Sequence, residues 1–272
     1  MAPQRKKLGV GRRNIAINPS FIEYSNSDMN DIREKIQKIV APMDGWLSFH
    51  EGSFLYDTAL KHASRGAIVE IGSWKGKSTI CLAHGVRDGK GDVVHAIDPH
   101  TGAPEHQEIF KTKNIWTFEE FQKNIKTAGI EKFVYPIVNH SENAAKNWRK
   151  PVAFLWIDGA HAYEAAKLDF DSWFPHLIEG GMIAYHDSTY DDVRKVMREC
   201  VFFSRNFNQI GVVDSITFAT KIAPSRQFFR DRLRNLYVYL LSAFYGLRRV
   251  PLPRSIRNSL KTIFKKIVHA LQ

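Results

Sequence analysis

Residues 67 to 79 read Ala67-Ile68-Val69-Glu70-Ile71-Gly72-Ser73-Trp74-Lys75-Gly76-Lys77-Ser78-Thr79, and this stretch decides the fold of the chain. Its apolar, β-branched beginning predicts a short buried strand. The two glycines, Gly72 and Gly76, predict a tight turn, and Ser78-Thr79 opens a helix. A strand, a glycine turn and a helix N-terminus together point backbone N–H groups at a bound carboxylate or phosphate.

Three ligands compete for this loop. A nucleoside triphosphate requires four residues between the two glycines of its binding loop, and here only three intervene. NAD requires the pattern G-x-G-x-x-G, which is absent. S-adenosylmethionine (SAM) fits best, because its cationic groups suit the neighbouring Glu70 and its carboxylate suits the helix N-terminus. The loop alone does not exclude an ordinary strand-to-helix turn that binds nothing.

The rest of the chain alternates strand and helix patterns. We expect further strands at 93–97, 134–138, 152–157, 181–185, 209–213 and 216–220. Helices are expected at 28–40, 52–64, 118–127, 141–148, 162–178 and 191–200, and a long loop at about 99–115. This alternation predicts a doubly wound α/β fold, in which helices cover both faces of a mostly parallel sheet. The last two strands flank Asp214-Ser215 as an antiparallel hairpin and bring the sheet to seven strands.

Polar residues follow almost every predicted strand. Asp98, Asp158 and the pair His186-Asp187 each come directly after an apolar run, as Gly72 does. Ligands of open α/β sheets bind outside the carboxyl ends of the strands. We therefore expect these side chains to share one crevice, with Asp98 placed to accept the ribose hydroxyls of a nucleoside. The alternative for each acid is that it only caps the helix that follows.

Asp158 and Asp187 end neighbouring strands in this scheme, and His161 lies on the loop after the first of them. Two adjacent carboxylates repel each other unless a cation lies between them. Oxygen ligands with a nearby imidazole suit Mg²⁺ or Mn²⁺. Such an ion would bind the hydroxyl of an acceptor, and His161 could then take its proton as the catalytic base.

Two of these motifs resemble the class I SAM-dependent methyltransferases. The stretch from Glu70 to Ser78 is similar to their first motif in the form E-x-G-x-x-x-G-x-S, which is typical of the catechol-type O-methyltransferases. The segment 157–163, with Asp169, Trp173, Gly180-Gly181 and His186-Asp187, resembles a bacterial subgroup that includes macrocin O-methyltransferase-like and cephalosporin hydroxylase-like proteins. The resemblance covers about 50–221 and implies a Rossmann-like fold.

The resemblance also implies residue roles. SAM would be held by the loop residues and by polar groups at the next strand ends, namely Glu70, Gly72, Ser73, Trp74, Gly76, Ser78, Asp98, Ser141 and Asp158. The metal ligands would be Asp158, His186 and Asp187. His186 stands where the family has a further acid, and His161 stands where catechol-type enzymes carry a catalytic lysine.

Charge divides the chain of 272 residues into three parts. Residues 1–13 hold five Lys or Arg and no acid, and residues 226–272 hold eleven against one acid, so the net charge of +11 belongs to the ends. We expect a disordered basic N-terminus at 1–20, a methyltransferase domain at 21–225 and a basic helical tail at 226–272. Because the middle is mildly acidic, charge does not predict a nucleic-acid partner.

Apolar residues recur at helical spacing near the end of the chain, opposite Arg257, Lys261, Lys265 and Lys266. Such a helix suits an anionic membrane surface. Packing on the core and a dimerisation arm, which would make a homo-oligomer, are the alternatives. Two cysteines, no secretory signal and no long apolar run favour a cytoplasmic protein, peripheral at the inner membrane face.

The sequence therefore predicts a metal-assisted O-methyltransferase that uses SAM. Its acceptor would be a small molecule, a sugar or a lipid-linked glycan that carries a free hydroxyl. A hydroxylase-like relative that uses the same pocket is one alternative. A non-catalytic protein with a SAM-type fold, held at the membrane surface, is the other.

Overall fold

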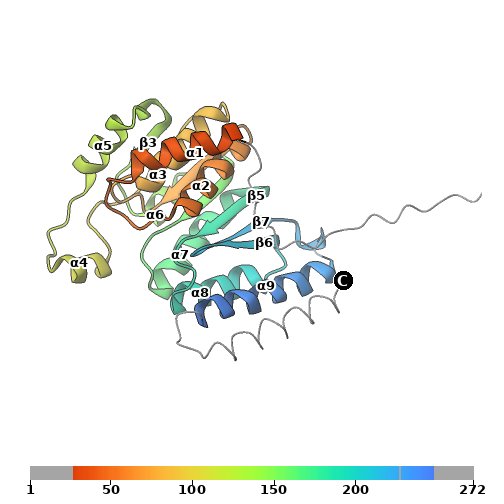
Figure 1. Cartoon of the computed structure of the whole chain (residues 1–272). Coiled ribbons are helices and arrows are strands. Elements are labelled where there is room, and N and C mark those ends of the chain that lie inside the picture. Colours follow the sequence, from red (N-terminus) through yellow and green to blue (C-terminus); the bar gives the residue numbers. More distant parts are fainter. Residues whose placement is uncertain (1–26, 227, 248–272) are drawn as a thin grey trace, which may run out of the picture. The chain divides into compact units, whose positions relative to one another are not determined.

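The alternating pattern builds one seven-stranded sheet in the order β3-β2-β1-β4-β5-β7-β6 (Figure 1). The computed structural model describes residues 27–226 and 228–247. The strands are β1 (Ala67–Ile71), β2 (Val94–Ile97), β3 (Val134–Ile137), β4 (Val152–Ile157), β5 (Leu177–Tyr185), β6 (Phe207–Val213) and β7 (Ile216–Lys221). β1 to β5 are parallel, and β7 pairs antiparallel with both β5 and β6. The predicted Rossmann-like, mostly parallel sheet with a terminal hairpin is confirmed.

Nine α-helices connect or flank these strands in the part of the chain that the structure describes. They are α1 (Ser27–Val40), α2 (Phe49–His62), α3 (Lys77–Asp88), α4 (Pro104–Phe110), α5 (Phe118–Thr127), α6 (Ser141–Lys146), α7 (Tyr163–Trp173), α8 (Asp191–Met197) and α9 (Phe229–Leu247). Four short helical turns complete the chain, namely η1 (Glu131–Phe133), η2 (Phe174–His176), η3 (Arg198–Phe202) and η4 (Pro224–Arg226).

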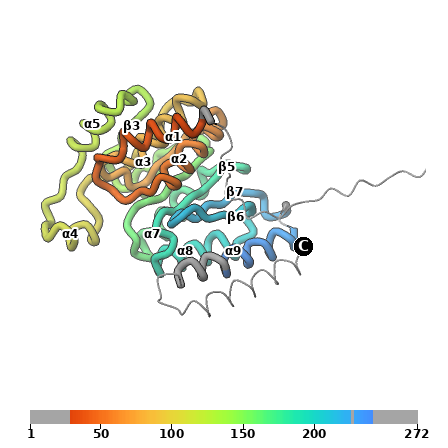
Figure 2. The backbone as a smooth tube through the Cα atoms, viewed as in Figure 1, coloured from red at the N-terminus to blue at the C-terminus, as the bar shows by residue number. Residues whose placement is uncertain are grey.

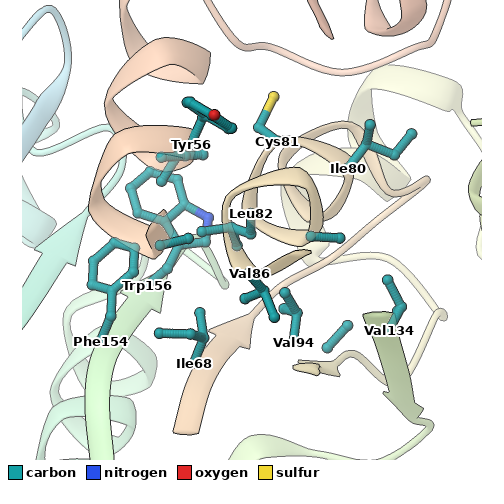
Figure 3. Close-up of a cluster of buried hydrophobic side chains, with 14 of the residues drawn as sticks. Tyr56, Ile68, Ile80, Cys81, Leu82, Val86, Val94, Val134, Phe154 and Trp156 are labelled. Carbon is teal, nitrogen blue, oxygen red and sulfur yellow. The ribbon is translucent and has the colours of Figure 1, made fainter. Parts of the chain in front are cut away.

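Alternate residues of each strand point to opposite faces of the sheet, so the fold has two apolar layers. On one face, Ile68, Val94, Phe154 and Trp156 pack under α1, α2 and α3 (Figure 3). On the other face, side chains of β1, β4 and β5 pack against α7, α8 and η3. Because both faces are covered, the central strands read as continuous apolar runs.

The register of the parallel strands aligns their carboxyl ends. Ile71 lies opposite Ile97 on one side and Ile157 on the other, and Ile157 lies opposite Tyr185. The residues that follow these positions therefore emerge side by side at one edge of the sheet. This alignment, which the strand order imposes, places the candidate site.

Several boundaries differ from the sequence prediction. The expected loop after β2 contains the short helix α4, and Figure 2 shows this segment as a long excursion between β2 and α5. The helix predicted at 162–178 ends at Trp173, because Pro175 follows in η2, and β5 already begins at Leu177. α2 begins at Phe49 behind the N-cap Ser48, three residues earlier than expected.

α9, the first helix of the basic tail, packs on the core, which is one of the alternatives given above for the tail. Val238 is buried, and the Asn235 side chain donates a hydrogen bond of 3.2 Å to the carbonyl of Phe207 in β6. α9 begins at Phe229 and so includes the apolar stretch at 235–247. The amphipathic pattern beyond residue 247 and the basic N-terminus at 1–20 lie outside the described residues. Within those residues, none of the helices has the length and apolarity to cross a bilayer.

The packing of α3 against α2 makes a first prediction. A Cβ added at Gly85 of α3 would lie 2.3 Å from the backbone oxygen of Tyr56 in α2. Alanine in place of glycine normally stabilises a helix by about 1 kcal/mol. Here we expect Gly85→Ala to lower the free energy of unfolding by about 1–3 kcal/mol, because backbone cannot yield to the new methyl group. Urea denaturation measures the difference.

Gly52→Ala is the matched control for Gly85→Ala. Its Cβ would meet the Cys81 sulfur at 3.3 Å, across the same pair of helices. A side chain can shift by the few tenths of an ångström needed, so we expect a smaller loss of stability there. A Gly85→Ala protein as stable as the wild type would contradict the close approach of the two helices.

Candidate active site

A cavity of about 390 Å³ opens at the carboxyl ends of the parallel strands. Backbone hydrogen bonds continue the pairing of the strands into the walls of the cavity. The N–H groups of Asp98, Gly72, Asp158 and His186 donate to the carbonyls of Ile137, Ile97, Ile71 and Ile157, respectively. Asp98, Asp158 and Asp187 all line this cavity beside Gly72. The structure thus brings together the acids that the sequence placed at neighbouring strand ends.

The glycine loop forms one wall of the cavity. Gly72 has a φ of +85°, and a Cβ there would lie 2.2 Å from the carbonyl oxygen of Asp158, so only glycine fits. Trp74 lies in the left-handed region with a φ of +46°, and its N–H donates to the Asp98 carboxylate at 2.7 Å. Ser73 is 1% exposed and lines the cavity, and its hydroxyl has no hydrogen-bond partner among the described residues.

Gly76 supports the loop from behind, although the sequence placed it among the SAM contacts. It is the N-cap of α3 with a φ of +89°, and a Cβ there would meet Phe121 and Ile125 of α5 at 3.2 Å. It does not line the cavity. Its role is to let α3 start close to α5.

Glu70 is also placed differently from the prediction. Its side chain is fully buried and does not line the cavity. Its two carboxyl oxygens accept hydrogen bonds from Ser78 at 2.6 Å and Thr79 at 2.5 Å. Burial raises the pKa of Glu70 to about 8 against the opposing effect of these two bonds. Glu70 therefore ties β1 to the first turn of α3, and of this group only Ser78 reaches the cavity.

Asp98 and Ser141 form the wall beyond the loop. Asp98 accepts from the backbone of Trp74 with one oxygen and from that of His100, at 2.6 Å, with the other. Each oxygen keeps a second lone pair, so the carboxylate can still accept two hydroxyl groups. Ser141 donates to Asp169, whose pKa burial raises to about 6. Asp169 lines the cavity as well, so the site includes it beside the predicted serine.

His186 lies at the centre of an acidic cluster. Its Nδ1 is 2.9 Å from Asp158 and 3.4 Å from Asp187, and its Nε2 is 3.5 Å from Glu51. Burial opposes the charge on the ring, but the attraction and hydrogen bond of Asp158, together with Glu51 and Asp187, raise the pKa of His186 to about 11. The ring is therefore an imidazolium that balances three carboxylates.

This arrangement does not suit His186 as a metal ligand. A histidine binds a metal through an unprotonated nitrogen, and both ring nitrogens of His186 face carboxylates. A different triad, Asp158, His161 and Asp187, presents ligand atoms that lie within 4.8 Å of one another. The two predicted acids therefore lie where they can hold a hard divalent ion together, with the His161 ring next to them.

His161 lies where the base was expected, at the wall next to Asp187. Its Nε2 is 3.5 Å from Asp187, and its backbone N–H donates to Glu105 of α4 at 3.3 Å. The ring stacks on Tyr190 with ring centroids 4.9 Å apart. These contacts hold the imidazole at the cavity wall, where it can reach an acceptor hydroxyl.

An aromatic stack that the sequence analysis did not single out covers the glycine loop. His106 of α4 stacks on Trp74 at 4.2 Å and on Trp46 at 5.8 Å, and all three line the cavity. Burial lowers the pKa of His106, which favours the neutral ring in the stack. The one available signal for α4 was a proline in the first turn of a helix, at Pro104.

Comparison with known proteins agrees with this geometry. Residues 69–188 match a family model described as a methyltransferase domain. The structure of the O-methyltransferase NovP superposes with a TM-score of 0.57 at 14% sequence identity, covering 72% of this chain and 100% of NovP. The S-adenosylhomocysteine-bound methyltransferase PaMTH1 of Podospora anserina gives 0.51 at 14% identity, with 75% and 99% covered. At this identity the two superpositions concern the fold.

The fold and the family match together define the class: a class I methyltransferase domain at residues 69–188. Residues 69–188 thus form a methyltransferase domain, as the resemblance predicted, and the donor that this resemblance implies is SAM. The cavity fits that donor, because it offers the Gly72 cradle, an unpartnered Ser73 hydroxyl and the Asp98 carboxylate in one wall. The finer bacterial subgroup and the residue roles stay predictions.

The burial of Glu70 predicts that the stability of the protein depends on pH. Between about pH 5 and about pH 8 the unfolded chain loses the proton of Glu70 while the folded protein keeps it, so this group lowers the stability of the wild type as the pH rises. Glu70→Gln cannot ionise and escapes this loss. We expect the stability of Glu70→Gln relative to the wild type to increase across that range, as measured by urea denaturation at several pH values.

Glu164→Gln, on the exposed side of α7, is the control for the effect of removing a carboxyl group. A constant difference in stability between Glu70→Gln and the wild type at every pH would contradict the account of Glu70.

Proposed function

We propose that the protein transfers a methyl group from SAM to a hydroxyl of a sugar or another small polyol. The observation that carries this proposal is the convergence of Asp98, Asp158 and Asp187 on one cavity beside Gly72. The loop that would bind the donor and the two acids that would hold a hydroxyl therefore line the same cavity. The likeness in fold to NovP, an O-methyltransferase, supports oxygen as the acceptor atom.

SAM would lie along the wall that the glycine loop and Asp98 form. The backbone at Gly72, Ser73 and Trp74 would receive its methionine part, with Ser78 behind it, and Asp98 would accept the ribose hydroxyls. The adenine would lie towards Ser141, and Asp158 would face the sulfonium side. Glu70 and Gly76 would act indirectly, by holding the first turn of α3 in place.

The acceptor would lie on the opposite side, against Asp158, His161 and Asp187. Asp158 and Asp187 would hold Mg²⁺ or Mn²⁺, which supplies a Lewis acid that lowers the pKa of the acceptor hydroxyl. His161 takes the hydroxyl proton while the acceptor oxygen forms its bond to the methyl carbon and the carbon–sulfur bond of SAM breaks. Alignment of the reacting atoms supplies about 7–11 kcal/mol in reactions of this kind.

The aromatic stack favours a sugar-like acceptor. Trp46 is 59% exposed and lines the cavity, so it offers a flat apolar face next to polar groups. Sugars combine such apolar faces with hydroxyl groups that acids and imidazoles bind. A lipid-linked glycan would satisfy the same chemistry. The hydroxylase-like alternative and the non-catalytic alternative differ from the proposal in making no methylated product.

The test is mass spectrometry of sugar-nucleotide and membrane fractions incubated with the protein and SAM. We expect a product heavier by one CH₂ group with Mg²⁺ present, and a lower yield with EDTA. His161→Ala should keep the affinity for SAM in isothermal titration but lose about 10²–10⁴-fold in turnover, because the proton acceptor is gone. His176→Ala, whose histidine lies outside the cavity, is the matched control.

Retained turnover in His161→Ala would remove this residue from the role of base. SAM binding without any methylated product would favour the non-catalytic alternative. Full activity in EDTA would leave methyl transfer in place and remove the metal.

We further propose that the basic tail binds an anionic membrane and holds the enzyme at its cytoplasmic face. α9 buries one side on β6 but leaves Phe229 and the preceding Phe228 exposed by 74% and 72%, with Leu236 and Leu240 also exposed. The sequence 248–272 adds seven Lys or Arg and no acid. Exposed apolar residues next to basic ones favour an anionic interface.

Vesicle flotation tests the tail. We expect the full chain to float with phosphatidylglycerol vesicles and not with phosphatidylcholine vesicles. The combined variant Lys261→Gln, Lys265→Gln and Lys266→Gln should bind about 100-fold more weakly, because each basic residue near such a surface contributes about 1 kcal/mol. Equal flotation of variant and wild type, or flotation that high salt does not weaken, would contradict electrostatic binding.

A further inference from the structure

Glu51 lies at the edge of the active site although it belongs to neither strand ends nor glycine loop. It is in the first turn of α2, outside the matched segment 69–188, and only 4% of its surface is exposed. Charged residues are rarely buried unless they are paired. Its partners therefore indicate what it does.

The Glu51 carboxylate is held by donors from three parts of the chain. One oxygen accepts from the backbone N–H and the hydroxyl of Ser215, in the β6–β7 turn, at 2.9 and 2.6 Å. The other accepts from the backbone N–H of Ser48 at 2.8 Å and lies 3.5 Å from Nε2 of His186. Although burial opposes it, the bond and charge of His186, with the donors Ser215 and Ser48, lower the pKa of Glu51 to about 2.

His186 connects the Glu51 carboxylate to the acids of the active site. Its ring lies between Glu51 and the pair Asp158 and Asp187, with one nitrogen toward each side. The Trp156 ring packs beside it, with centroids 5.5 Å apart. The ring can donate to Asp158 from Nδ1 only while Nε2 faces Glu51, so the two contacts fix one orientation of the imidazole.

We propose that Glu51 is a positioning residue for methyl transfer: through His186 it holds the carboxylates of Asp158 and Asp187 in the orientation that faces the acceptor. The proposal rests on the proposed function for the position of the acceptor. It assigns a role to segments on both sides of the matched domain, because α2 supplies Glu51 and the β6–β7 turn supplies the Ser215 donors that hold it.

The decisive variant is Glu51→Gln, which has the shape of glutamate. Every neighbour of this carboxylate donates a hydrogen bond, so the NH₂ group of glutamine opposes a donor in either orientation. We expect kcat to fall about 10- to 100-fold, as for outer-shell partners of ligating side chains. The Kd for SAM should change much less than kcat, because the polar partners of Glu51 are Ser48, Ser215 and His186, none of which belongs to the glycine loop.

Ser48→Ala is the matched control. Ser48 caps the same helix turn by accepting from the backbone N–H of Glu51 at 3.1 Å, and its removal leaves the contact between Glu51 and His186 in place. It should lower the melting temperature and keep kcat. If Glu51→Gln does not fold, Ser215→Ala decides, since it removes one donor to Glu51: a reduced kcat supports the proposal and a wild-type kcat overturns it.

A second readout needs no acceptor. The ring N–H protons of His186 in the full-length protein, assigned by their loss in His186→Asn, report the contact by NMR. We expect the Nε2–H resonance to move or broaden in Glu51→Gln and to stay in Ser48→Ala. A resonance unchanged in Glu51→Gln, or a wild-type kcat, would overturn the proposal. Failure of the proposed function would instead appear as a wild type that binds SAM and methylates nothing.

Discussion

At Gly72 the chain leaves β1 with a φ of +85° and passes so close to β4 that a Cβ would lie 2.2 Å from the Asp158 carbonyl. This contact joins the two halves of the cavity. In the proposed function, the loop that Gly72 begins would bind the donor, and Asp158, His161 and Asp187 would bind the acceptor. A methyl group can move between two ligands only if their binding sites meet at one point, and the missing side chain at Gly72 lets them meet.

The same closeness concentrates negative charge. Asp98, Asp158 and Asp187 line one cavity, and Glu51 lies behind them. Carboxylates this close would raise one another's pKa and lose their charge if nothing compensated. The His186 ring lies within the cluster, between Glu51, Asp158 and Asp187, and its raised pKa favours the charged imidazolium there. This positive charge offsets part of the repulsion among the acids around it.

The parallel register explains how much of this site the sequence could predict. Asp98, Asp158 and Asp187 could be grouped because each follows an apolar strand, and parallel strands bring those positions to one edge. Glu70 lies within β1, and its side chain turns inward because Ser78 and Thr79 on the next helix donate to its two oxygens. The pattern Ser48-x-x-Glu51 signals a helix start. That the same carboxylate also faces His186 depends on long-range packing, which no local pattern encodes.

The two lysines of the glycine loop bind other parts of the protein. Beside glycines and a serine, Lys75 and Lys77 suggest a phosphate site, yet both amino groups are already bound. Lys77 donates to the carbonyls of Met43 and Gly45 at 3.0 Å, and Lys75 pairs with Asp44 at 2.7 Å and Glu120 at 2.9 Å. They hold the segment before α2, and with it Trp46, over the cavity. These two positive charges thus hold neighbouring segments together, and the acids Asp98, Asp158 and Asp187 would face the cationic methyl donor of the proposed function.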